Sequence, residues 1–116
     1  MRPYRVRRAA ATQRDFDIID SHLIESYQAL LGEMLEAAQA RAAERIDEAL
    51  AYMRTFREAP YRGTEQSHIR PGLRMVSHAN FVFYFEIDEE AGVVTILAVF
   101  FGRLNHARQI LERLDG

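Results

Sequence analysis

The sequence predicts an α+β fold: an N-terminal strand, an antiparallel two-helix hairpin, a three-stranded antiparallel meander and a short C-terminal helix. Two observations support this order. Apolar residues recur every three or four positions from residue 16 to residue 56, as they do along one face of a helix. Residues 73–101 instead hold β-branched and aromatic runs separated by turn residues, a pattern typical of strands joined by hairpins.

The first two predicted elements are a short strand and a long helix. Residues 4–8 alternate apolar and basic side chains, as in a strand with one buried face. We expect Thr12 to be the N-cap of the following helix, with Asp15 in its first turn. The apolar stripe of this helix consists of Phe16, Ile19, Leu23, Tyr27 and Leu30.

A second helix is predicted after Gly32, because glycine is common just beyond a helix C-terminus. Its stripe consists of Leu35, Ala38, Ala42, Ile46, Ala49, Met53 and Phe56. The three alanines would let two helices approach closely, which favours an antiparallel hairpin. The apolar spacing also fits a helix that continues through Gly32, so the position of the turn stays open.

The second half of the chain predicts three strands and a final helix. Pro60 and Gly63 mark the end of the second helix. Strands are expected at residues 73–77, 81–87 and 93–101, with a break at 78–80 and an acidic loop at 88–92. The last strand, VVTILAVFF, has no polar face and is therefore expected to be central and covered on both sides. Helical spacing of apolar residues in 105–114 predicts the C-terminal helix.

Composition limits the chemistry of this chain. Its 116 residues suit a single domain spanning residues 1–116. Cysteine is absent, which excludes disulfides, thiolate catalysis and cysteine-based zinc sites, and the four histidines lack metal-ligand spacing. We therefore expect no metal and no cofactor. No stretch has the length of a membrane span or a signal peptide, so we expect a cytoplasmic protein.

Charge is unevenly divided along the chain. Residues 9–53 carry nine acids and three arginines, a net charge of −6, whereas the rest carries twelve arginines and eight acids, a net charge of +4. This asymmetry either marks a face that binds polyanions or reflects a solvated helix surface beside a basic sheet. We expect no direct sequence-specific binding of nucleic acid.

Several short motifs follow one another in a characteristic order. They are Asp15-Phe16 with Ile19, Pro60 with Gly63, Ile69-Arg70-Pro71-Gly72-Leu73-Arg74, Phe83-Tyr84 with Ile87-Asp88, and Ile96-Leu97 and Val99 with Gly102-Arg103. In this order they resemble the RelE/ParE superfamily of type II toxin–antitoxin toxins, and most of all its ParE branch of plasmid stabilisation toxins. The chain departs from the pattern at Phe85, Phe101 and Asn105, where many members have arginine, histidine and a nearby aspartate.

The resemblance to ParE implies a protein-binding toxin that inhibits DNA gyrase and is neutralised by a cognate, ParD-like antitoxin, as a homodimer or in a toxin–antitoxin hetero-oligomer. The candidates for contact with the target are Arg74, Arg103, Asn105 and Arg108. The candidates for contact with the antitoxin are Leu23, Tyr27, Leu30, Leu31 and Met34, because so many apolar side chains cannot all face one small core. Alternatively, the C-terminal helix or a second copy of the chain covers them.

The resemblance to RelE implies a different activity, cleavage of mRNA on the ribosome. That reaction needs a general base, a general acid and cations for the developing phosphorane charge. The candidates are Arg74, His78, Tyr84 and Arg103, with His68 as a further proton carrier. The absence of lysine and the negative net charge argue against this alternative, so catalysis is the less favoured mode of action. A third alternative is an inactive structural relative, harmless when expressed alone.

Overall fold

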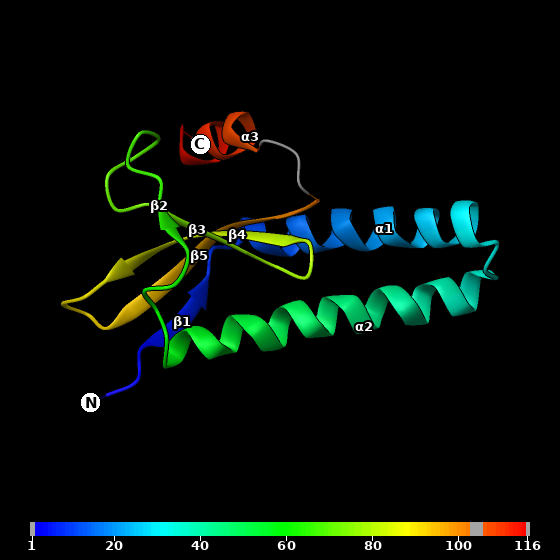
Figure 1. Cartoon of the computed structure of the whole chain (residues 1–116), viewed down its shortest axis with the longest axis horizontal. Helices are drawn as coiled ribbons and strands as arrows, with labels where there is room; N and C mark the ends of the chain where they lie inside the picture. Colours follow the sequence, from blue (N-terminus) through cyan, green and yellow to red (C-terminus); the bar gives the residue numbers. More distant parts are fainter. Residues whose placement is uncertain (1, 103–105, 116) are drawn as a thin grey trace.

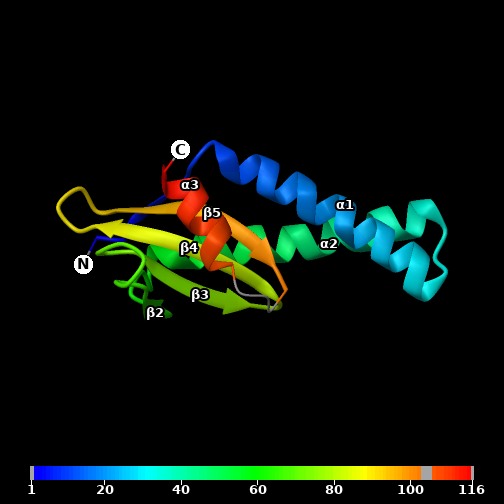
Figure 2. The same cartoon turned by 90° about the horizontal axis from the view of Figure 1, so that it is seen from above.

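A five-stranded sheet carries a long helical hairpin on one face and a short helix on the other (Figures 1 and 2). The computed structural model describes residues 2–102 and 106–115. The elements are β1 (Arg5–Arg8), α1 (Ala11–Leu31), α2 (Leu35–Arg54), the 3₁₀ turn η1 (Thr55–Arg57), β2 (Thr64–Glu65), β3 (Arg74–His78), β4 (Phe81–Asp88), β5 (Val93–Phe101) and α3 (Ala107–Asp115). The predicted order of strand, helix hairpin, meander and C-terminal helix is confirmed.

The sheet is larger than the predicted meander. Its strand order is β1-β5-β4-β3-β2, in which β3, β4 and β5 are antiparallel neighbours as expected. β1 joins β5 in parallel, which the intervening helices make possible because parallel strands need a long crossover. β2 has only two residues, too few to show a sequence period, and pairs with β3.

The helical hairpin turns at the predicted glycine. Gly32 adopts φ +66°. Its N–H donates to the Gln28 carbonyl and the Glu33 N–H donates to the Tyr27 carbonyl, which ends α1. The predicted N-cap was wrong: α1 begins after Ala10, which makes no side-chain cap. Thr12 lies one residue inside the helix, and its hydroxyl donates to the Ala9 carbonyl over 2.8 Å.

The core is divided by the sheet into two layers. The larger layer lies between the sheet and the α1–α2 hairpin and contains Phe16, Ile19, Leu23, Ala42, Ala49, Met53, Phe56, Phe81, Phe83, Phe85, Val94, Ile96 and Val99. The smaller layer lies under α3 and contains Leu73, Val82, Tyr84, Ala98 and Ile110. Alternate residues of β4 therefore face opposite layers, as the two-residue period of a strand requires.

A bulge in β5 changes which of its residues face the helical hairpin. Tyr84 pairs with Ala98 while its neighbour Phe85 pairs with Ile96, so Leu97 is the extra residue. Up to Ile96 the even-numbered residues face the helical hairpin, and from Val99 onward the odd-numbered residues do. Both faces of β5 are covered, which confirms the expectation of a central strand.

The distal part of the hairpin extends past the sheet as a two-helix arm (Figure 2). All five buried residues of α1 lie between Thr12 and Leu23, and none lies in its last eight positions. In the arm, α2 contributes the buried Ala38 and Ala42, so the two helices support each other there through small residues. Among the described residues, no helix is long and apolar enough to cross a membrane.

Candidate functional site

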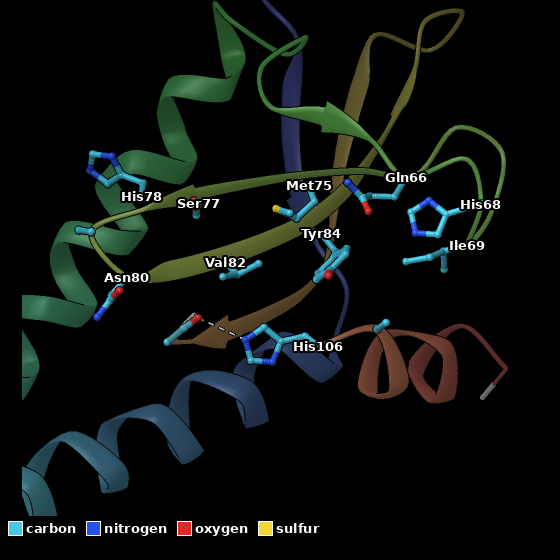
Figure 3. Close-up of a pocket in the computed structure, with 13 residues that line it drawn as sticks. Gln66, His68, Ile69, Met75, Ser77, His78, Asn80, Val82, Tyr84 and His106 are labelled. Atoms are coloured by element: carbon cyan, nitrogen blue, oxygen red, sulfur yellow. Dashed lines mark hydrogen bonds between the residues drawn. The ribbon is translucent and has the colours of Figure 1, made fainter. Parts of the chain in front are cut away.

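A groove lies on the outer face of the sheet, the face away from the helical hairpin (Figure 3). Its volume is about 740 Å³. Met75 of β3 and Val82 and Tyr84 of β4 form the floor, the segment 66–69 forms one wall, and the start of α3 forms the other. None of the described residues that line this groove is an arginine, aspartate or glutamate, so histidines are the only described lining residues that can carry a charge.

A close approach of the backbone at Gly63 to β3 sets the position of the groove wall formed by residues 66–69. Gly63 has φ +72°, and a Cβ atom there would lie 2.1 Å from the Met75 carbonyl oxygen. Only glycine allows the chain to approach β3 this closely. The segment that follows is held back against the sheet by the Gln66 N–H, which donates to the Leu73 carbonyl over 2.7 Å.

Tyr84 is the most enclosed polar side chain of the groove floor. It is 5% exposed and packs edge-on against Phe100 with ring centroids 5.9 Å apart. Its hydroxyl makes no hydrogen bond within the described part of the chain and is open to the groove. Burial raises the pKa of the Tyr84 phenol above its ordinary value of 10.0, so the group is a neutral hydrogen-bond donor at pH 7.

His106 closes the groove on the α3 side. Its ring stacks on Phe100 at 4.7 Å, and its Nε2 lies 3.3 Å from the Gly102 carbonyl oxygen (Figure 3). Because a carbonyl oxygen can only accept, this contact requires the proton on Nε2. The other nitrogen, Nδ1, is enclosed and has no hydrogen-bond partner among the described residues.

The sheet separates the residues that would serve a nuclease. Arg74 and His78 pair with Phe85 and Phe81, whose side chains belong to the layer under the hairpin. His78 borders the groove, but its ring stacks on Tyr52 of α2 at 4.0 Å. Tyr84 points to the opposite side (Figure 3). Arg103 lies outside the described residues. His68 lines the groove wall and shares the face of Tyr84, not that of Arg74.

The Arg74 guanidinium is also held by neighbouring carbonyl groups and a glutamate. It donates to the carbonyl groups of Tyr61 and Arg62 over 3.3 Å each and lies 3.5 Å from Glu65, with its side chain 14% exposed. Of the other candidates for target contact, Arg108 lies on the surface of α3 with its side chain 90% exposed, and Asn105 lies outside the described residues. Arg74 and Arg108 therefore do not share a surface.

A buried ion pair anchors α3, and its role was not predicted. Arg113 of α3 meets Asp15 of α1 through two hydrogen bonds of 2.5 and 2.9 Å. Asp15 also accepts from the Val99 N–H, and Arg113 donates to the Leu97 carbonyl. These backbone groups lie at the β5 bulge, where β1 no longer covers the strand edge. The hydrogen bonds to Asp15 raise the pKa of Arg113.

The apolar candidates for antitoxin contact divide into a buried and an exposed group. Leu23 is 3% exposed in the core, so in this structure it presents no surface to a partner, and Tyr27 is half-buried. The hairpin tip consists of four exposed side chains, namely Leu30 at 82%, Leu31 at 60%, Met34 at 79% and Leu35 at 50%. The described residues contain no cluster of three or more side chains suited to holding a metal ion.

Comparison with known proteins identifies the family. The family model described as the ParE toxin of the type II toxin–antitoxin system parDE matches residues 4–111. The chain belongs to the ParE toxin family. It is thus a toxin of the type II toxin–antitoxin class, which confirms the resemblance seen in the sequence.

Solved structures agree with this ParE assignment at the level of the fold. The chromosomal ParDE system of P. aeruginosa aligns with TM-score 0.64 at 15% identity, over 86% of this chain and 97% of that one. The RelBE2 toxin–antitoxin complex of Mycobacterium tuberculosis aligns with TM-score 0.52 at 17% identity, over 85% and 98%. A free, doubly substituted E. coli RelE toxin aligns with TM-score 0.51 at 9% identity, over 97% of each chain. No curated protein sequence matched.

Proposed function

We propose that this ParE-family toxin arrests growth by binding DNA gyrase in the cytoplasm and not by cleaving RNA. The observation that carries the proposal is that Arg74 and the His78 ring lie towards the helical hairpin, whereas Tyr84 lies on the opposite face, where His78 only borders the groove. Attack by a ribose 2′-hydroxyl needs a base, an acid and a cation within reach of one phosphate. A sheet that keeps Tyr84 on the other side from Arg74 and His78 does not offer that arrangement.

We also propose that a ParD-like antitoxin neutralises the toxin by binding the hairpin tip. Leu30, Leu31, Met34 and Leu35 form an exposed apolar surface on the arm, which is the kind of surface that receives the apolar face of a partner helix. The P. aeruginosa and M. tuberculosis structures are named as toxin–antitoxin systems, which supports a partner of this class.

Purified DNA gyrase provides the direct test. Supercoiling of relaxed plasmid is measured with increasing amounts of toxin freed of antitoxin. We expect supercoiling to fall, cleaved DNA to accumulate, and antitoxin to reverse both effects. If folded toxin that still arrests growth leaves gyrase unaffected, the gyrase proposal is wrong, and a parallel assay of mRNA cleavage on ribosomes then decides whether RNA is the target.

A further inference from the structure

We infer that the groove on the outer face of the sheet is the surface that holds the target, and that its ligand is an uncharged, extended segment of a protein. This inference rests on the proposed function, since it assigns a site to the protein-binding activity. Its support comes from the free Tyr84 hydroxyl, the chemistry of the lining and the size of the groove.

The Tyr84 hydroxyl is available to a partner from outside this chain. The hydroxyl forms no hydrogen bond with a described residue, and it is not among the fully enclosed polar atoms that lack a partner, so it stays open to water in the groove. The rest of the Tyr84 side chain is enclosed on its apolar sides. As the neutral phenol is a donor, a ligand that presents a carbonyl oxygen to the groove floor would satisfy it.

The rest of the lining suits a polypeptide. Met75 and Val82 provide apolar contact beside Tyr84, while Ser77 and Gln66 provide a hydroxyl and an amide at the edges (Figure 3). The Gln66 amide nitrogen is held by the Thr64 hydroxyl, which leaves its carbonyl oxygen available as an acceptor. A peptide backbone carries both donors and acceptors, and its side chains can meet the apolar floor.

A phosphodiester chain fits this lining less well. Placing a phosphate in the groove would remove its hydration without an arginine among the described lining residues to replace it. Arg74 lies towards the other face of the sheet, and Arg113 is bound to Asp15. The volume of about 740 Å³ is that of a cleft for a small ligand, so we expect a loop or chain terminus to enter and not a folded domain.

Three variants test the site. Tyr84→Phe removes only the hydroxyl, and because that hydroxyl has no partner within the described structure, the fold should be unaffected. Ser77→Arg places a long charged side chain in the groove from an exposed strand position. Ser21→Arg makes the same change in charge and size at an exposed position of α1, away from the groove, and is the matched control. Circular dichroism and antitoxin binding confirm that each variant is folded.

Binding to purified gyrase subunits is the first measurement. We expect Tyr84→Phe to weaken binding about two- to tenfold, the loss of one neutral hydrogen bond. Ser77→Arg should weaken binding at least about tenfold, since it blocks the groove and leaves an unpaired charge there. Ser21→Arg should bind as wild type does. If Ser77→Arg binds gyrase as tightly as wild type, the inference is overturned; if Ser77→Arg fails to fold, unchanged binding by Tyr84→Phe overturns it.

Growth arrest separates this inference from the gyrase proposal. If wild-type toxin does not bind gyrase, the gyrase proposal fails, and the same variants are compared for arrest of growing cells. Loss of arrest in Ser77→Arg but not Ser21→Arg, with no mRNA cleavage by wild type, supports a different protein in the groove. If wild type cleaves mRNA and Ser77→Arg abolishes that cleavage, the groove binds RNA and the inference is overturned. Unchanged growth arrest by Ser77→Arg also overturns it. A wild-type chain without any toxicity overturns both proposals.

Discussion

Removing the Asp15 carboxylate should destabilise the protein severely, because that carboxylate connects α1, the β5 bulge and α3. Asp15→Ala leaves the Val99 N–H without its acceptor and leaves Arg113, whose side chain is 26% exposed, without its counter-charge. Breaking a buried ion pair by removing one partner costs about 3–5 kcal/mol. A domain of this length has a total stability of about 6–17 kcal/mol, so the loss is a large fraction of it.

Urea unfolding followed by circular dichroism measures this cost. A double-mutant cycle with Arg113→Ala isolates the pair, and we expect an interaction energy of about 2 kcal/mol or more between the two positions. The matched control is Glu112→Ala, which breaks the exposed pair with Arg108 and should change stability by less than about 0.5 kcal/mol. A cost below about 1 kcal/mol for Asp15→Ala, or simple additivity of the two changes, would refute the reasoning.

Three further predictions concern the tip, the groove and the turn before it. Leu30→Asp combined with Met34→Asp should weaken antitoxin binding at least about tenfold in calorimetry without lowering the melting temperature, whereas Gln39→Asp, an exposed change on the same arm, should not. The raised pKa of Tyr84 means that the unfolded chain ionises first, so the free energy of unfolding should fall as pH rises above about 10, and less so in Tyr84→Phe; equal slopes would contradict this. Gly63→Ala should lower stability by about 1–3 kcal/mol in urea unfolding, because of the positive φ and the clash with β3; a neutral effect would show that the loop moves freely.

The local elements could be predicted because each has its own pattern in the sequence. The apolar stripes marked α1 and α2, Gly32 marked the turn between them, and the β-branched run of β5 marked a covered strand. The prediction of Thr12 as N-cap was wrong because the Thr12 hydroxyl donates to the Ala9 carbonyl, in the segment that connects β1 to α1. β2 was missed because two residues carry no period.

The candidate site was less predictable, because it depends on which side of the sheet each residue faces. Arg74, His78 and Tyr84 lie close in sequence, yet strand alternation and the pairing register send Tyr84 to one face and the other two to the opposite face. The apolar residues of the hairpin were recognised as too many for one core, but only their packing separates the buried Leu23 from the exposed Leu30.

The sequence alone determined the fold class, the family and the surplus of apolar side chains on the hairpin, since these depend on local periodicity and on motifs in a fixed order. The tertiary structure alone decided the parallel place of β1, the bulge at Leu97, the ion pair between Asp15 and Arg113 and the groove around Tyr84. Each of these joins residues far apart in the chain. Their contacts follow from the way helices and strands pack, which no local pattern of residues records.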